Sequence, residues 1–203
     1  LDIRFLPSQN PKQILKDEYN FSEIDIEWFN ETKHKNVFKV TTDKGIYVLR
    51  VFPENRLSDQ VDRDISILEF LEKHNFPAHR LVKTKDNKPS VTINNRKALL
   101  LDYLEGKHPE LNTETVAKIG TLMSRLHKLG EENKYSYKSS WSIKQEREIL
   151  HNELKRPEIA NLPDPEGIIA QVKQKFDKLP DLENLPQVLI HTDMHGNNII
   201  EKD

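Results

Sequence analysis

The sequence contains no cysteine, which excludes disulfide bonds, thiolate chemistry and cysteine-based zinc sites within these 203 residues. No apolar run approaches the roughly 20 residues of a membrane span, and the amino terminus lacks the basic start and apolar core of a signal peptide. Neither sign of charge dominates, because 31 Lys and Arg residues stand against 33 Asp and Glu residues. We therefore expect a cytoplasmic protein that has no nucleic-acid or membrane partner.

What is present is the composition of a globular protein, with 35% hydrophobic and 32% charged residues. The length suits one large domain or two small lobes that share an interface. We expect a monomer or a weak dimer.

The first half of the chain is predicted to form a small antiparallel sheet with one helix packed against it. Strand-like runs flank an Asp/Gly turn at 43–45 and an Asn pair at 94–95, as in hairpins. Between them, Val61, Ile65 and Leu68 recur at the spacing of one helix face. The expected elements are a surface helix over 11–19, strands over 36–40 and 46–52, a helix over 58–71, and strands over 91–93 and 98–101.

One charged residue interrupts the second of these strands. Side chains alternate between the two faces of a strand, so Arg50 shares its face with Val48 and Phe52. A cation between apolar neighbours is poorly placed unless it meets an anion. Arg50 is therefore a candidate anion-binding residue.

The second half of the chain is predicted to be helical. After a short connector, apolar residues recur at helical spacing, with Val116, Ile119 and Met123 on one side of the first helix. Val188–Ile190 is predicted to be a short buried strand that leads into a polar loop, and Ile199–Ile200 to resume an apolar strand. The connector and the three helices are expected over 102–107, 113–129, 141–154 and 167–179.

The polar loop, residues 191–198 with the sequence HTDMHGNN, concentrates the chemistry of the chain. It is compatible with a hydrogen-bonded turn, in which Asp193 and Asn198 satisfy backbone groups. It is also compatible with a metal hydrolase, because His191, Asp193 and His195 would share one face of a strand and suit zinc or iron.

A third interpretation of the loop is phosphoryl transfer. In protein kinases, a catalytic-loop Asp accepts the proton of the substrate hydroxyl, and an Asn five residues later binds magnesium. Asp193 and Asn198 have the same spacing. The reaction calls for such a pair, because one side chain must hold the attacking oxygen and the other must hold the metal that shields the phosphates.

The loop resembles the His-Gly-Asp-x-His-x-x-Asn signature of the aminoglycoside phosphotransferase and choline kinase-like superfamily, with Thr192 and Gly196 as departures. This resemblance implies an α+β, protein-kinase-like fold with two lobes and the transfer of a γ-phosphoryl group from ATP or GTP to a small-molecule hydroxyl. It further implies that Asp193 is the catalytic base, that Asn198 binds Mg²⁺, and that His191 and His195 brace the loop.

Further parts of the family pattern occur in order along the chain. The strand that ends near Arg50 is similar to the one that carries the family's phosphate-binding Lys, and Asp64 stands where a helix Glu normally pairs with that Lys. Residues 102–106 resemble the interlobe hinge, so the backbones of Asp102 and Leu104 are expected to bind the purine. The phosphate-covering loop would fall near residues 30–36; it has no glycine, and Thr32 or Lys33 are its expected contacts.

The resemblance predicts a nucleotide lobe over 1–101, a hinge over 102–107 and a partial helical lobe over 108–203. The family's second magnesium ligand, an Asp in a hairpin after the catalytic loop, would follow Asp203, so we expect a fragment that is not competent alone. The acceptor is expected to be aminoglycoside-like, or alternatively homoserine, choline or methylthioribose. A non-catalytic nucleotide-binding relative is a further alternative.

Overall fold

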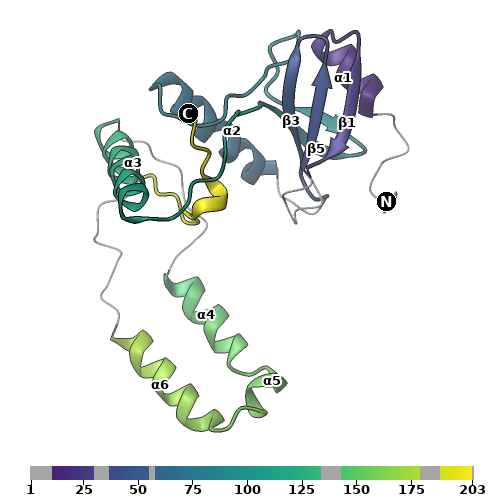
Figure 1. Ribbon diagram of the computed structural model, residues 1–203. Coiled ribbons are helices and arrows are strands. Elements are labelled where there is room, and N and C mark those ends of the chain that lie inside the picture. Colours follow the sequence, from purple (N-terminus) through teal and green to yellow (C-terminus); the bar gives the residue numbers. More distant parts are fainter. Residues whose placement is uncertain (1–10, 30–36, 55–57, 134–142, 179–187, 203) are drawn as a thin grey trace. The chain divides into compact units, whose positions relative to one another are not determined.

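The computed structural model describes residues 11–29, 37–54, 58–133, 143–178 and 188–202 (Figure 1). The chain divides into two compact units, one made of residues 1–122 with 191–203 and the other of residues 123–190. The first contains α1 (Pro11–Tyr19), β1 (Ile24–Trp28), β2 (Val37–Thr42), β3 (Gly45–Val51), α2 (Ser58–Lys73), β4 (Val91–Ile93), β5 (Arg96–Asp102) and the 3₁₀ turn η2 (Gly196–Asn198). The helix α3 (Thr113–Glu132) runs from the first unit into the second, which also contains α4 (Ile143–Glu153), α5 (Pro157–Ala160) and α6 (Pro165–Asp177).

A five-stranded sheet with the order β1-β2-β3-β5-β4 forms the centre of the first unit, and all its neighbouring strands are antiparallel. Both predicted hairpins are confirmed. Asn94 and Asn95 join β4 to β5 with φ angles of 47° and 60°, the left-handed pair that a two-residue type I′ turn requires. Asparagine tolerates this region better than most residues, because its short polar side chain bonds locally.

The strand β1 was not predicted from the sequence. Its residues alternate strictly between half-buried apolar and exposed charged side chains, with Ile24, Ile26 and Trp28 turned toward the core. That period of two is a strand signal, and Asp25 and Glu27 are its solvent-facing half.

Helices cover both faces of the sheet. Leu15 and Tyr19 of α1 pack on the face that carries Phe38, Val40 and Leu49. On the opposite face, α2 is held by a second set of buried residues, which comprises Val48, Phe52, Val61, Ile65, Leu81, Leu99 and Leu101. The alternation predicted along β3 is thus confirmed, and Arg50 belongs to the α2 side of the sheet.

The segment between α2 and β4 extends the sheet beside the end of β5. Leu81 forms an isolated bridge with Leu101, and the Val82 N–H donates to the Leu100 carbonyl at 2.9 Å. Because β4 pairs only with the first residues of β5, this segment supplies hydrogen bonds to the part of β5 that β4 does not reach.

The helix α3 begins at a side-chain cap. The Thr115 N–H donates to the Asn112 side-chain oxygen at 2.9 Å, which satisfies one of the free amides of the first turn. Leu126 is buried as expected. Val116, predicted on the same apolar side, is 56% exposed, so that assignment was wrong for the first turns of the helix.

The strands predicted on either side of the polar loop do not form as expected. Residues 188–190 form no strand, and Ile190 is 53% exposed. Ile199 and Ile200 are not a strand either, and only Glu201 forms an isolated bridge, with Lys107. Three consecutive apolar residues indicate burial but do not specify a partner strand, and the described part of the chain offers none here.

In the second unit, α6 begins at Asp164, whose side chain accepts a hydrogen bond of 3.0 Å from the Gly167 N–H. Pro165 occupies the first helical position, where no amide hydrogen is needed. The helices predicted over 141–154 and 167–179 are confirmed as α4 and α6. Each predicted end lies within two residues of the end that the structure describes. Among the described helices, none has both the length and the apolar character needed to cross a membrane.

Candidate functional site

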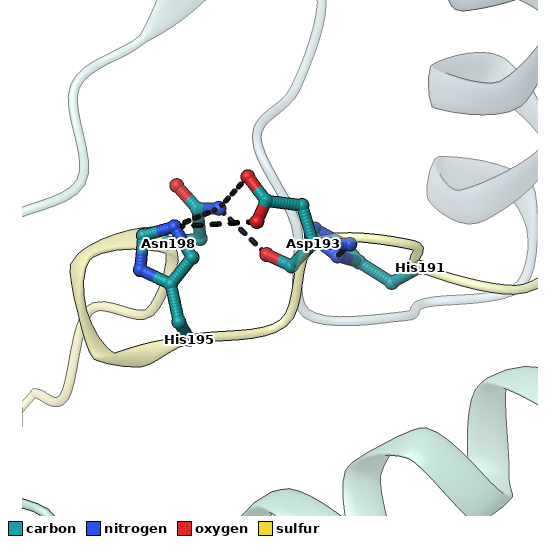
Figure 2. A network of polar contacts seen from close by, with 4 residues as sticks. All are labelled: His191, Asp193, His195 and Asn198. Atoms are coloured by element: carbon teal, nitrogen blue, oxygen red, sulfur yellow. Dashed lines mark hydrogen bonds and ion pairs between the residues drawn. The ribbon is translucent and has the colours of Figure 1, made fainter. Parts of the chain in front are cut away.

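The polar loop folds into a turn at Thr192 and Asp193 followed by the 3₁₀ turn η2. The Asn198 N–H donates to the His195 carbonyl at 2.9 Å, and the Ile199 N–H donates to that of Gly196 at 3.2 Å. These two bonds bring the end of the loop back toward its beginning. Asp193, His195 and Asn198 therefore lie side by side (Figure 2).

The side-chain amide of Asn198 is tied to Asp193. Its nitrogen donates to the Asp193 backbone carbonyl at 2.7 Å and to the carboxylate Oδ2 at 2.9 Å. Both partners are acceptors only, so the nitrogen must face Asp193 and the amide oxygen must point away from it, as Figure 2 shows. An amide oxygen is a ligand that Mg²⁺ accepts, so the Asn198 oxygen fits as one ligand of such an ion.

His195 lies against both of these residues. Its Nε2 is 3.1 Å from the Asn198 side-chain nitrogen and 3.4 Å from Asp193 Oδ1. The two hydrogens of the Asn198 amide are already directed at Asp193, so a third full hydrogen bond from that nitrogen is not available. A hydrogen on His195 Nε2 can instead point to Asp193 Oδ1, although 3.4 Å is long for such a bond.

His191 lies on the other side of Asp193 from His195 (Figure 2). The Asp193 N–H donates to its Nδ1 at 3.3 Å, so this ring nitrogen is the acceptor and carries no hydrogen. Within the described ranges, no group of three or more His, Cys, Asp or Glu side chains is arranged to hold a metal ion. The shared face that a metal hydrolase would need from His191, Asp193 and His195 therefore does not form.

The Asp193 carboxylate is open to a substrate. Its side chain is 75% exposed, and that of His195 is 49% exposed. A catalytic base must be reachable by the group whose proton it takes. The loop thus presents an oriented carboxylate and, beside it, an oriented amide oxygen.

Arg50 lies on the α2 side of the sheet and Asp64 lies on α2. The guanidinium carbon of Arg50 lies 5.0 Å from the centre of the Phe52 ring, a cation–π distance, and the Arg50 side chain is exposed, so its charge stays hydrated. The α2 residues Val61 and Ile65, which flank Asp64, pack in the same cluster as the Val48 and Phe52 that flank Arg50. The pairing of Arg50 with Asp64 remains a prediction.

The backbone of Asp102 is partly used within the protein. Its N–H donates to the Arg80 carbonyl at 3.0 Å, and its carbonyl lies 3.0 Å from His79 Nδ1. The Asp102 carboxylate accepts the Arg80 N–H at 2.6 Å. A carbonyl oxygen has two lone pairs, so the Asp102 oxygen can accept one further hydrogen bond, whereas its N–H is already committed.

The backbone of Leu104, unlike the partly committed backbone of Asp102, is available for hydrogen bonding. Within the part of the chain that the structure describes, neither its N–H nor its carbonyl has a hydrogen-bond partner. A purine held at this connector would therefore find a free donor at Leu104 and a free lone pair at Asp102. Thr32 and Lys33, the expected phosphate contacts, lie outside the described residues.

His79 was not identified from the sequence. It stands alone in an irregular segment between α2 and β4, 23 positions before Asp102. Only the pairing of this segment with the end of β5 brings the two together, and no local pattern signals that contact.

Comparison with known proteins identifies the class of fold. The model of the phosphotransferase enzyme family matches residues 29–202. A curated homoserine kinase from Zymomonas mobilis is 24% identical over 188 residues, which cover 87% of this chain and 55% of the relative. One from Rhodospirillum rubrum is 24% identical over 171 residues, which cover 82% of this chain and 51% of the relative. The chain thus spans about half the length of the curated relatives it matches.

Solved structures agree on the fold. An amicoumacin kinase bound to AMP-PNP superposes with a TM-score of 0.66 at 17% identity, over 96% of this chain and 61% of that one. A spectinomycin phosphotransferase bound to ADP and spectinomycin gives a TM-score of 0.61 at 16% identity, over 97% of this chain and 66% of that one. The predicted α+β, protein-kinase-like fold is confirmed.

Proposed function

The chain belongs to the phosphotransferase enzyme family, and we propose that the protein containing it transfers the γ-phosphoryl group of ATP or GTP to a hydroxyl group of a small molecule. The observation that carries this proposal is the tie between Asn198 and Asp193, with Asn198 Nδ2 at 2.9 Å from Asp193 Oδ2. This hydrogen bond places a candidate base next to a candidate metal ligand. The five-residue spacing of the two residues matches that of the Asp and Asn in a kinase catalytic loop.

In the proposed reaction, Asp193 is the base. Its exposed carboxylate accepts a hydrogen bond from the acceptor hydroxyl and takes its proton as the hydroxyl oxygen bonds to the γ-phosphorus. The bond from that phosphorus to the β-phosphate oxygen breaks, which leaves a phosphate ester and a nucleoside diphosphate. Because Asn198 holds Oδ2, the carboxylate is oriented before the substrate arrives, and preorganisation of this kind lowers the barrier.

Asn198 would hold Mg²⁺ through its amide oxygen, the atom that points away from Asp193. When bound, the ion neutralises charge on the phosphate oxygens. The Asn198 nitrogen thus orients the base while its oxygen serves the metal. Asp193 and Asn198 act as one unit in this proposal, with His195 and His191 as the residues that brace them.

The nucleotide would be held by the first unit. Arg50, fixed by Asp64, contacts the phosphates in this proposal, and its forked guanidinium suits the bidentate binding of phosphate oxygens. The purine lies at the connector over residues 102–107, which would act as the hinge between a nucleotide lobe over 1–101 and a helical lobe over 108–203. Among the described residues, the Leu104 N–H has no partner there, and the Asp102 carbonyl accepts only one hydrogen bond. Both contacts are made by backbone, so they leave ATP and GTP as equal candidates.

Two classes of acceptor are supported by different observations. The solved neighbours that act on amicoumacin and spectinomycin favour an aminoglycoside-like acceptor. The curated relatives named homoserine kinase favour homoserine, a metabolic acceptor, and choline and methylthioribose are the other metabolic candidates. A nucleotide-binding relative that does not catalyse transfer is the remaining alternative.

A direct experiment separates these possibilities. The intact protein is incubated with Mg²⁺ and γ-labelled ATP or GTP, together with aminoglycosides, homoserine, choline or methylthioribose in turn. Transfer of label to one acceptor, at a rate that Asp193→Asn lowers by about 10² to 10⁴, supports the proposal. Asparagine can still accept the Asn198 hydrogen bond, so this variant keeps the loop geometry.

Absence of label in every acceptor, with nucleotide still bound, would instead identify a binding protein. Undiminished transfer by Asp193→Asn would remove Asp193 from the role of base.

A further inference from the structure

The segment that leaves the catalytic loop is joined to the end of the connector. The Lys107 N–H donates to the Glu201 carbonyl at 3.1 Å, and the Glu201 N–H donates back to the Lys107 carbonyl at 2.9 Å. Next to this reciprocal pair, Nδ1 of His108 lies 2.9 Å from the Ile199 carbonyl oxygen. Three hydrogen bonds thus connect residues 107–108 with residues 199–201.

The close approach of these two segments requires glycine at position 106. Gly106 has a φ angle of +145°, a conformation that residues with a Cβ rarely adopt. A Cβ at this position would lie 2.7 Å from Cγ2 of Ile200 and would collide with the Glu201 carbonyl oxygen. The backbone of the connector can therefore lie against residues 200–201 only because no side chain stands between them.

His108 must donate to Ile199. A carbonyl oxygen is an acceptor only, so the hydrogen of this bond is on Nδ1 of the imidazole. Residue Ile199, which follows Asn198, is then held by both of its backbone polar groups. The Ile199 N–H donates to the Gly196 carbonyl inside the loop, and the Ile199 carbonyl accepts from His108 outside it.

The ion pair between Glu201 and Lys118 adds little to this contact between the two segments. The Glu201 carboxylate lies 3.7 Å from Nζ of Lys118 on α3, but these side chains are 41% and 61% exposed. Exposed pairs of this kind contribute little to stability, because solvent and salt screen them. The backbone pair and the His108 bond therefore contribute more to the spacing of the two segments than this ion pair does.

We propose that Gly106 and His108 are positioning residues that hold Asn198 in register with the connector, so that metal binding and purine binding occur at a fixed separation; this inference rests on the function proposed above. Asn198 directly precedes Ile199, the residue whose carbonyl His108 holds. Loss of the His108 bond leaves the Asn198–Asp193 contact in place but frees the Ile199–Ile200 peptide to rotate, which loosens the backbone next to Asn198. The oxygen of Asn198 then spends less time in its metal-binding position.

The test measures metal binding without turnover. In the intact protein, the affinity for Mn²⁺ is measured by electron paramagnetic resonance in the presence of a non-hydrolysable ATP analogue. One hydrogen bond between neutral groups contributes about 0.5–1.5 kcal/mol, so His108→Ala should weaken Mn²⁺ binding about 2- to 12-fold. Affinity for the analogue without metal should be unchanged.

A conservative variant and a matched control accompany this measurement. The side-chain nitrogen of asparagine occupies nearly the place of Nδ1 in histidine, so His108→Asn should restore most of the Mn²⁺ affinity. His151→Ala removes an exposed histidine of α4 and should leave both affinities unchanged. If His108→Ala folds poorly, as judged by circular dichroism, rescue by His108→Asn still decides the question.

Glycine substitutions give a second pair of variants. Gly106→Ala should weaken Mn²⁺ binding more than His108→Ala does, because the added methyl group forces the two segments apart. Gly120→Ala is the control, since nothing lies within 4 Å of the added Cβ on the exposed face of α3.

The outcomes distinguish this inference from the proposed function. Mn²⁺ affinity that is equal in wild type, His108→Ala and Gly106→Ala would overturn the inference even if the protein transfers phosphoryl groups. Weakened Mn²⁺ binding in both variants, in a protein that phosphorylates no acceptor, would support the inference and reject the catalytic role.

Discussion

The side-chain nitrogen of Asn198 lies 2.7 Å from the backbone carbonyl of Asp193 and 2.9 Å from its carboxylate. One amide therefore fixes both the main chain and the side chain of the proposed base. The oxygen of the same amide group remains available to bind a cation. Because its nitrogen donates to Asp193 and its oxygen can bind a metal, asparagine suits position 198 better than aspartate does. An aspartate at 198 could bind the metal but would repel Asp193.

The first prediction concerns this pair. Asn198→Ala should lower kcat about 10- to 150-fold, because a hydrogen bond to a charged group contributes about 1.5–3 kcal/mol. In a double-mutant cycle with Asp193→Asn, the two effects should not add, since Asn198 acts partly through Asp193. Steady-state kinetics of the four proteins measure the coupling. Strictly additive losses would mean that the two residues contribute independently.

The second prediction concerns Arg50. If its guanidinium binds phosphate oxygens, Arg50→Ala should weaken ATP binding about 10-fold or more, the loss expected for a charge-assisted hydrogen bond. Binding of adenosine, which has no phosphate, should change little. Isothermal titration calorimetry with the two ligands makes the comparison.

Arg50→Lys is the informative companion to this variant. It keeps the positive charge but loses the planar group that stacks on Phe52. We expect ATP affinity between that of the wild type and that of Arg50→Ala. Equal losses for ATP and adenosine in Arg50→Ala would point to a packing role instead of a phosphate contact.

The third prediction concerns Tyr19, whose ring stacks on Phe21 with their centres 5.7 Å apart. Its hydroxyl is buried and has no hydrogen-bond partner among the described residues. An unsatisfied buried hydroxyl costs about 1–3 kcal/mol. Tyr19→Phe should therefore leave the free energy of unfolding unchanged or raise it by about 1 kcal/mol in urea titrations near pH 7. A loss of more than 1 kcal/mol would reveal a partner for the hydroxyl.

The same residue predicts a response to alkali. Burial, with a smaller contribution from Glu18, raises the pKa of the Tyr19 phenol above its usual value of 10.0. The folded state then holds the proton more tightly than the unfolded state, so stability is fully present below pH 10 and falls as the pH rises beyond it. In Tyr19→Phe this fall should be smaller. Unfolding free energies at pH 8, 9, 10 and 11 test the difference.

The fourth prediction concerns the β4–β5 turn. Asn95 has a φ angle of 60°, which glycine adopts without cost and alanine does not. Asn95→Gly should stabilise the protein by about 0.5 kcal/mol, as Asn-Gly is the favoured type I′ pair, and Asn95→Ala should destabilise it by about 1 kcal/mol. Urea unfolding of the three proteins gives the order. Alanine equal to or better than asparagine would contradict the observed turn.

Local features of this protein were predictable because their causes are local. The two hairpins follow from strand-like runs around Asp43–Gly45 and Asn94–Asn95, where the turn residues themselves favour the required backbone angles. The proximity of Asp193 and Asn198 follows from a spacing of five residues in a short loop. The strand β1 shows an equally clear alternation of apolar and charged residues. It was missed because the charged residues Asp25 and Glu27 make the segment look like a polar loop.

Other features depended on partners that no local pattern identifies. Val188–Ile190 was expected to be a buried strand, yet its apolar residues find no pairing strand among the described residues, and Ile190 is exposed. His79 and His108 look alike in the sequence, as single histidines in irregular segments. Only the fold gives each a carbonyl to bind, at Asp102 and Ile199.

The loop over residues 191–198 shows most clearly which features the sequence determines and which depend on tertiary contacts. Its residue types and spacing are properties of the sequence, and they were enough to suggest a base and a metal ligand. Three interpretations of the loop remained possible, because composition does not specify which atoms face one another. The tertiary structure decided that Asn198 turns its nitrogen to Asp193 and that His191 accepts a hydrogen bond from the Asp193 backbone, on the other side of Asp193 from His195. It also placed Gly106 and His108 against the end of the loop across 91 residues of chain, since contacts of that range depend on packing and not on neighbours in sequence.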